Sequence, residues 1–309
     1  MQDTPPLLSP EARARVAALA LSARGIVEGF LAGQHRSPYH GYSVEFAEHR
    51  AYNAGDPLRH VDWKVLAKTD RLYVKRFEEE TNLRHVALLD TSASMRYAGA
   101  AEASKLHYGA RLCAALHTLL VRQRDATGLV AFDARVHTVV EPRASAAHLG
   151  PLFATLDRLV HDPPARAART AAAQSLTALA ERLPRRALVT LVSDLFENVD
   201  EASDLRRALR LLRTRGHEVV VFHVLDAATE ARLDVEDRPT TFVDAETGER
   251  ITTHPADIRA AYREAAAAYV ADFRAACLAD GIDFVEMDTA APFDRALAAY
   301  LHARRRAAR

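Results

Sequence analysis

The sequence predicts an α/β protein with a doubly wound, mostly parallel sheet, preceded by an N-terminal helix and a small β-containing module. From residue 84 onward, strand-like apolar runs alternate with helix-like stretches, as they do in repeated βα units. Residues 187–192 and 219–224 are apolar except at Thr190 and His223, which is typical of parallel strands covered on both faces. These observations favour a sheet enclosed between helices.

The individual elements follow from the same patterns. Apolar residues at helical spacing in the longest stretch mark one buried face that includes Leu106 and Cys113. The short link Asp133–Arg135 reads as a tight hairpin, so we expect one antiparallel edge strand. We expect strands at 84–90, 127–132, 136–140, 187–193, 218–225 and 282–287, helices near 101–123, 145–160, 171–183, 202–215, 255–279 and 292–305, and a hairpin insertion at 238–253.

The first 83 residues have a different pattern. Ser9, Pro10 and Glu11 form a helix-start signal, and apolar residues then recur at helical spacing as far as Gly33. Residues 34–83 are irregular, with short strand-like runs near 42–46 and 72–77. We expect residues 1–83 to pack on the sheet of an α/β domain at 84–309, because a short module cannot bury enough surface alone.

Composition excludes several classes of protein. The 309 residues contain 41 Lys and Arg against 41 Asp and Glu, so no overall charge recruits nucleic acid or an anionic membrane. The two cysteines, Cys113 and Cys277, read as buried thiols of a reducing cytosol. No window of 18 apolar residues and no signal-peptide pattern occurs, so we expect a cytoplasmic protein without a membrane span.

Oxygen-bearing side chains follow the first strand of the domain. The apolar run that begins at Val86 ends in Asp90, and Ser92 and Ser94 follow at alternating positions. Hard cations such as Mg²⁺ take oxygen ligands, and Mg²⁺ is bound by few carboxylates with waters completing an octahedron. Taken alone, the motif fits equally well a serine-rich turn that caps a helix.

A second strand and a further loop add oxygens of the same kind. The run at 187–193 is followed by Asp194, and Thr170 stands just before the helix expected at 171–183. In an open α/β sheet, ligands bind outside the carboxyl ends of the strands. If the strands ending at Asp90 and Ser193 are neighbours, these side chains converge at one edge of the sheet.

This arrangement resembles the metal-ion-dependent adhesion site of von Willebrand factor A domains. In that family an Asp-x-Ser-x-Ser sequence, a Thr and a later Asp hold Mg²⁺ or Mn²⁺, and a partner's carboxylate completes the coordination. The threonine of the family usually follows glycines, whereas here it follows Ala168 and Arg169. The resemblance implies metal-binding roles for Asp90, Ser92, Ser94, Thr170 and Asp194.

The segment before the α/β domain points to one particular family with such a domain. The successions at 33–46, 50–57, 59–64 and 72–75 are similar to the bacterial DUF58 family, whose members couple such a module to a von Willebrand-like domain. The resemblance covers essentially the whole chain. It implies a protein–protein interaction function, with a MoxR-type AAA+ ATPase as the partner and a role in assembly or maturation of other proteins.

Three functions stay open at this point. The leading hypothesis is a non-enzymatic, metal-dependent interaction protein without catalytic residues, since no phosphate loop, dinucleotide loop or nucleophile elbow is present. The second is a metal-dependent phosphohydrolase, for which His85 and His223 are the nearest candidate bases, although both fall on predicted strands. The third is a degenerate domain without metal, which Arg169 favours.

Overall fold

A computed structural model describes fifteen stretches of the chain. They are residues 14, 44–51, 63, 65–66, 72–79, 83–99, 103–133, 135–162, 176–177, 180, 183, 186–195, 199–245, 247–291 and 297. The chain divides into two compact units, Ser37–Leu83 and the remainder, which contains Arg84–Arg309. The packing of residues 1–83 on the sheet stays a prediction.

The smaller unit contains an antiparallel pair of strands. β1, Val44–Ala51, pairs with β2, Tyr73–Glu79, and the register shifts between Phe46 and Glu48. The two strand-like runs of this segment are therefore confirmed as strands. The helix expected after Ser9 lies outside the described residues, apart from helical Ala14.

The larger unit is built on a six-stranded sheet whose strand order is β10-β7-β6-β3-β4-β5. Five strands are parallel, and the sixth, β5, pairs antiparallel with β4 at one edge, as predicted from the short link before it. The predicted neighbours, the strands that end at Asp90 and Ser193, lie side by side. The strands are β3 (Arg84–Asp90), β4 (Ala126–Phe132), β5 (Val136–Arg143), β6 (Ala187–Ser193), β7 (Glu218–Leu225) and β10 (Asp283–Asp288).

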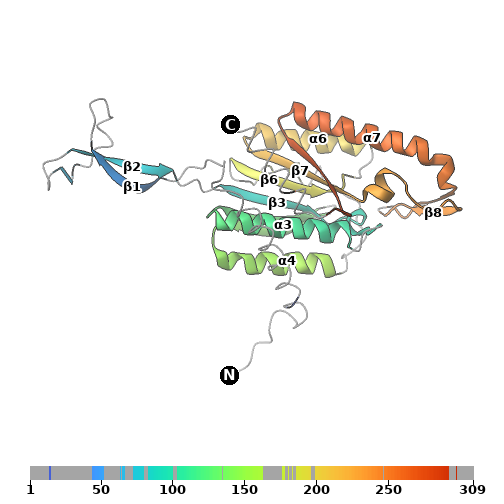
Figure 1. Cartoon of the computed structure of the whole chain (residues 1–309), viewed down its shortest axis with the longest axis horizontal. Coiled ribbons are helices and arrows are strands. Elements are labelled where there is room, and N and C mark those ends of the chain that lie inside the picture. The colour runs from blue at the N-terminus through green and yellow to red at the C-terminus, as the bar shows by residue number, and fades with distance from the viewer. Residues whose placement is uncertain are drawn as a thin grey trace, which may run out of the picture. The chain divides into compact units, whose positions relative to one another are not determined.

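Helices cover both faces of this sheet (Figure 1). α3, Lys105–Arg122, and α4, Leu149–His161, lie on one face, whereas α6, Val199–Thr214, and α7, Pro255–Ala279, lie on the other. The predicted α/β fold with a doubly wound, mostly parallel sheet is therefore confirmed. Of the helix expected at 171–183, the structure describes Leu176, Thr177 and Ala180 as helical, and the helix expected at 292–305 lies outside the described residues except Leu297.

A short hairpin interrupts the alternation after β7. The chain makes a π-helical turn, η4 (Ala227–Ala231), and then forms β8, Thr240–Val243, and β9, Arg250–Thr253. These antiparallel strands confirm the hairpin expected at 238–253. α7 begins directly afterwards with Pro255 at its first position, where a missing N–H costs no hydrogen bond.

The core lies where the apolar strands meet the helices. Every residue of β6 is buried, and its neighbours β3 and β7 are buried over most of their length. Both cysteines are buried free thiols, as predicted. β5 alternates between half-buried and exposed residues, as expected of an edge strand with one solvated face. In the ranges described, no helix combines the length and apolar character that a bilayer crossing requires.

Buried histidines link the central strands. Nδ1 of His85 lies 2.7 Å from Oγ1 of Thr127, and Nε2 lies 3.0 Å from Oγ1 of Thr190. Burial lowers the pKa of His85 to about 3 and that of His223 to about 4. Both histidines lie on strands, as expected, and are neutral, buried residues at neutral pH.

The neutral state of His85 predicts acid sensitivity. Its pKa is lower in the folded protein than in the unfolded chain, so the stability it contributes is present above about pH 6.5 and is lost as the pH falls toward 3. We expect His85→Gln to reduce the slope of unfolding free energy against pH by up to about 1.4 kcal/mol per pH unit between pH 6 and 4. Denaturant unfolding of both proteins across this range measures the difference, and parallel curves would contradict it.

Candidate functional site

Asp90 is held rigidly at the carboxyl end of β3. Its side chain is fully buried, with Oδ1 accepting a hydrogen bond from the backbone N–H of Ser92 at 2.9 Å. Oδ2 accepts from the hydroxyl of Ser193, on the neighbouring strand β6, at 2.7 Å. The two adjacent strand ends are thus joined through this one carboxylate.

The two serines of the motif lie beside it. Ser94 begins a short 3-10 turn, η2 (Ser94–Arg96), and its Oγ lies 3.1 Å from Oγ of Ser92. Neighbouring oxygens of a Mg²⁺ octahedron with bonds of about 2.1 Å are about 3 Å apart. The spacing of these hydroxyls therefore fits two adjacent positions of such an octahedron.

A second buried carboxylate, that of Asp194, acts on Asp90 and completes a cluster with Ser92 and Ser94. Asp194 follows β6 and is almost fully buried. Burial raises the pKa of Asp90 to about 7, the negative charge of Asp194 adds to this rise, and the hydrogen bonds from Ser193 and Ser92 oppose it. Two buried carboxylates whose negative charges repel each other favour a positive charge beside them.

Four of the five residues predicted to bind metal therefore come together: Asp90, Ser92, Ser94 and Asp194. Thr170, together with Ala168 and Arg169 before it, lies outside the described residues, and its role stays a prediction. In the described part of the chain, no group of three or more His, Cys, Asp or Glu side chains could hold a metal ion. The candidate site accordingly depends on hydroxyls as well as carboxylates, a donor set that suits Mg²⁺ rather than zinc.

A buried lysine, which the sequence analysis missed, supplies a positive charge to this site. Lys105 is the first residue of α3, and its side chain is 1% exposed. Its ammonium donates to Oδ2 of Asp194 at 2.7 Å and to Oε1 of Glu230. Burial alone would lower the pKa of Lys105, but the charges of Asp194 and Glu230 raise it above its usual value. Lys105 is therefore a permanent cation.

Glu230 ties the turn after β7 to the same site. While one carboxylate oxygen accepts from Lys105, the other accepts from the backbone N–H of Asp226 at 2.8 Å. Asp226 in turn accepts from both the backbone N–H and the hydroxyl of Thr229, at 2.9 Å each. A Cβ added at Gly99 would lie 2.3 Å from Oδ2 of Asp226, so glycine is required for this close approach. The turns after β3 and β7 are thus fitted to each other.

The backbone around Asp194 has its own supports. The ring of His223, on β7, lies with Nε2 2.9 Å from the carbonyl oxygen of Asp194. The next residue, Leu195, has a positive φ of 54°, and its carbonyl oxygen accepts from the hydroxyl of Tyr269 at 2.9 Å. These bonds hold the Asp194 carboxylate at a fixed place beside the cluster.

The sequence contains a local indication that Lys105 has an acidic partner. Ser104 caps α3, accepting a hydrogen bond from the backbone N–H of His107 at 3.2 Å, so the next residue lies in the first helical turn. The helix dipole favours acids there and disfavours a lysine. A cation at that position indicates a nearby negative partner, but the sequence does not say which.

Comparison with known proteins now identifies the family. The family model described as "Protein of unknown function DUF58" matches residues 48–272. The chain belongs to the DUF58 family. This confirms the predicted membership, and the sheet described above is the mostly parallel α/β sheet expected of a von Willebrand-like member.

Relatives of this DUF58 protein occur in mycobacteria. The uncharacterized protein Rv1480 of Mycobacterium tuberculosis is 28% identical over 265 residues, which are 85% of this chain and 80% of the relative. The uncharacterized protein Mb1516 of Mycobacterium bovis matches with the same figures.

Solved structures with low sequence identity are also similar. The conserved hypothetical protein BatB from Bacteroides thetaiotaomicron is 17% identical, with a TM-score of 0.45, over 71% of this chain and 97% of that one. The SpRpn10 VWA domain is 12% identical, with a TM-score of 0.35, over 68% of this chain and 89% of that one.

Proposed function

We propose that this DUF58 protein is a non-enzymatic interaction protein whose binding of a partner depends on one Mg²⁺ or Mn²⁺ ion. The ligands are Asp90, Ser92, Ser94 and Asp194, joined by Thr170. The observation that carries this proposal is that two buried carboxylates and two serine hydroxyls converge at the ends of adjacent strands. The oxygens of the two hydroxyls are 3.1 Å apart. A hard divalent cation is the group that this donor set suits.

Each residue has a defined task in this proposal. Asp90 is oriented by Ser193 and by the backbone of Ser92, so it presents its charge without side-chain rearrangement. Lys105 neutralises part of the negative charge of Asp194, which leaves the bound cation electron-poor. When bound, the metal supplies Lewis acidity that attracts an acidic side chain of a partner.

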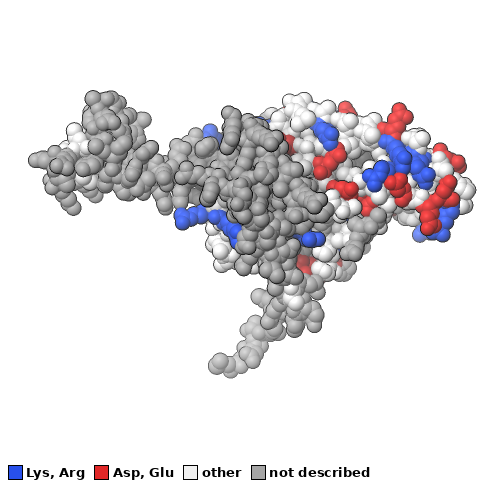
Figure 2. All heavy atoms as spheres, in the orientation of Figure 1, with Lys and Arg blue, Asp and Glu red and all other residues white. Residues whose placement is uncertain are grey.

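The proposed partner is a MoxR-type AAA+ ATPase, acting with this protein in assembly or maturation of other proteins. The family resemblance supports this choice, and the site's need for an incoming carboxylate supports a protein ligand. One carboxylate contact is too little for a stable complex, so a wider surface around the site must contribute. Basic and acidic side chains are interspersed on the described surface in view, so that surface presents no field of one sign (Figure 2).

One observation favours a second candidate, a site that works without metal. Lys105 already places an ammonium 2.7 Å from Asp194, so it can act as the resident cation of a degenerate adhesion site.

The structure supports a phosphohydrolase less well. Both ring nitrogens of His85 lie within hydrogen-bonding distance of threonine hydroxyls, and burial keeps His223 neutral and bonded to backbone.

Calorimetric titration separates the first two candidates. We expect wild-type protein to bind one Mg²⁺ or Mn²⁺, and Asp90→Ala to lose this binding while keeping a cooperative unfolding transition. Asp204→Asn, an exposed position on α6, is the matched control and should bind as wild type. Equal binding by wild type and Asp90→Ala would reject the metal site, and no binding by either would favour the lysine-only site.

The proposed ATPase partner is tested with the same wild-type and Asp90→Ala proteins. Complex formation with the cognate ATPase should require divalent metal, be lost in EDTA and weaken at least about tenfold in Asp90→Ala, since losing a hydrogen bond to a charged group costs about 1.5–3 kcal/mol. The purified protein should hydrolyse neither ATP nor phosphoesters. A complex that persists unchanged in EDTA contradicts the metal bridge.

A further inference from the structure

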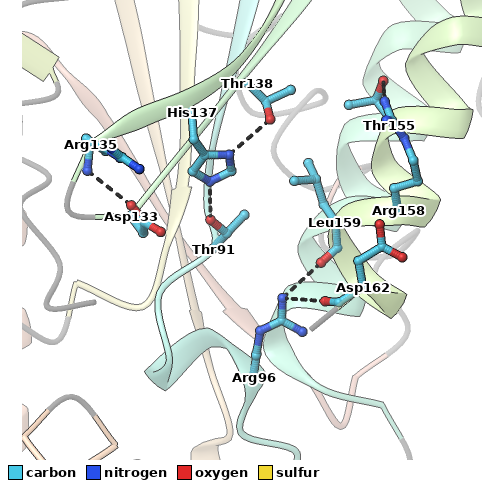
Figure 3. A pocket seen from close by; sticks show the side chains of 10 residues that line it. All are labelled: Thr91, Arg96, Asp133, Arg135, His137, Thr138, Thr155, Arg158, Leu159 and Asp162. Atoms are coloured by element: carbon cyan, nitrogen blue, oxygen red, sulfur yellow. Dashed lines mark hydrogen bonds between the residues drawn. The ribbon is translucent and has the colours of Figure 1, made fainter. Parts of the chain in front are cut away.

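A second polar pocket opens beside the candidate site, on the β5 side of the sheet's carboxyl edge. Figure 3 shows the turn between β4 and β5 and the strand β5 on one side, the end of α4 on the other, and Arg96 below. Its volume is about 250 Å³. This is smaller than the 300 Å³ or more typical of drug-sized ligands, so it suits a small head group.

Three arginines from three different elements line this pocket. Arg96 belongs to η2, Arg135 to the turn between β4 and β5, and Arg158 to α4. Among the described residues, none of these guanidinium groups pairs with a carboxylate. The contrast is with arginines elsewhere on the surface, which do form such pairs: Arg206 with Asp272, Arg210 with Asp280 and Arg274 with Glu286.

Arg96 forms the rigid floor. Its guanidinium donates to the carbonyl oxygens of Leu159 at 3.2 Å and Asp162 at 3.1 Å, at the end of α4 (Figure 3). These bonds satisfy orphan carbonyls of the helix but do not neutralise the charge of the arginine. Nε of Arg96 is buried without a hydrogen-bond partner. The floor therefore keeps its positive charge.

Two threonine hydroxyls of the pocket already donate hydrogen bonds to backbone carbonyl oxygens. Thr91 donates its hydroxyl to the carbonyl oxygen of Phe132 at 2.9 Å, so it accepts from Nε2 of His137, also at 2.9 Å. Thr155 donates to the carbonyl oxygen of Pro151 at 2.9 Å. One guanidinium nitrogen of Arg158 donates to Oγ1 of Thr155 at 3.4 Å, so the donor capacity for a ligand lies on the other N–H groups of Arg158 and on the guanidinium group of Arg135.

Acidic residues do not cancel this charge. Asp133 and Asp162 also line the pocket, against the three arginines, which leaves a net positive charge. Oδ1 of Asp133 is occupied by the backbone N–H of Arg135 at 3.1 Å in the turn. A ligand that accepts several hydrogen bonds and carries negative charge satisfies the pocket best, because guanidinium groups bind oxyanions in paired geometry.

We propose that this pocket binds a small oxyanion head group, of the phosphate monoester or carboxylate type, through Arg135 and Arg158 above the floor made by Arg96. The pocket and the candidate metal site share the loop 91–96, which sends Thr91 and Arg96 to the pocket and Ser92 and Ser94 to the cluster. The oxyanion needs no metal, because its charge is met by arginines alone.

Calorimetric titration with inorganic phosphate, and separately with acetate, tests the proposal on the full chain at low salt, after metal has been stripped with EDTA and the EDTA removed by dialysis, because EDTA is itself a carboxylate anion. We expect saturable binding, and a loss of about tenfold or more in Arg135→Gln/Arg158→Gln, because hydrogen bonds to charged groups contribute this much. Arg143→Gln, an exposed position at the end of β5 outside the pocket, is the matched control. Thermal unfolding shows whether each variant is folded.

The outcomes are distinct. Tighter binding of phosphate than of acetate identifies phosphate esters as the source of the head group, whereas the reverse identifies carboxylates. Absence of saturable binding to both anions, or equal binding by the double variant and Arg143→Gln, overturns the proposal. Since metal is removed beforehand, failure of the metal site leaves this result unchanged.

Discussion

Replacing Lys105 with methionine is expected to lower the free energy of unfolding by about 3–5 kcal/mol, because a buried ion pair that loses one partner leaves an uncompensated charge. Lys105 is 1% exposed and contacts two carboxylates, those of Asp194 and Glu230. Methionine fills a similar volume but offers no positive charge. Both acids are then left in a poorly solvated site that already contains Asp90. Urea unfolding in EDTA measures the loss.

Two controls separate this effect from a general cost of removing positive charge. Arg207→Met breaks an exposed pair with Asp204 and should cost less than about 1 kcal/mol. Adding Glu230→Gln to Lys105→Met should recover part of the loss, because one of the orphaned charges is removed. If Lys105→Met is no more costly than Arg207→Met, the ammonium does not balance the buried acids.

Lys105→Met also bears on the proposed metal. A divalent cation can take over the role of balancing Asp194, so Mg²⁺ should stabilise the variant more than it stabilises wild type. Binding linkage converts the metal affinity directly into added stability. The same unfolding curves, repeated with Mg²⁺ in place of EDTA, give this difference.

Replacing Gly128 with alanine is expected to cost about 3 kcal/mol, at the upper end of the usual cost of overpacking. A Cβ at this position would lie 2.5 Å from the carbonyl oxygen of Val140 and 2.8 Å from the backbone nitrogen of Pro142. Backbone atoms cannot rotate away as a side chain does, so β4 and β5 would have to separate. The register between these strands already shifts between Thr127 and Leu129. Thermal unfolding of the variant measures the cost.

The chain offers a matched glycine for comparison. Gly150, in the first turn of α4, has nothing within 4 Å of an added Cβ. Gly150→Ala should therefore raise stability by about 0.5–1 kcal/mol, since alanine loses less conformational freedom in a helix. Equal melting temperatures for the two variants would show that β5 adjusts without strain. Because Arg135 and His137 belong to the β4–β5 hairpin, Gly128→Ala should also weaken oxyanion binding.

The order of elements in the larger unit was predictable because it depends on local patterns. Largely apolar runs predicted β3, β6 and β7 with the bounds that the structure shows, since parallel strands are buried on both faces. The three-residue link before β5 predicted its antiparallel pairing. These features arise between residues close together in the chain, so composition and spacing are enough to reveal them.

The metal-ligand candidates were also accessible from sequence, because strand ends in a parallel sheet meet at one edge. Asp90 and Asp194 are 104 positions apart, yet the adjacency of β3 and β6 brings them to one cluster. α3, in contrast, begins at Lys105 rather than near residue 101, because Ser104 is its cap. Because the helix begins at residue 105, Lys105 lies in the first turn, where its charge opposes the helix dipole. With the start predicted near residue 101, the lysine gave no such signal.

Which charges meet depends on how the elements fold together. Lys105 finds its two acidic partners 89 and 125 positions away, and no local pattern encodes such distances. The same holds for the pocket, where Arg96, Arg135 and Arg158 come from three elements that the sheet order brings together. Periodicity reports which face of an element is buried, because burial repeats with the period of the helix or strand. The identity of a long-range partner depends instead on how the elements assemble. The residues next to a polar side chain in the sequence do not reveal which distant residue it will contact.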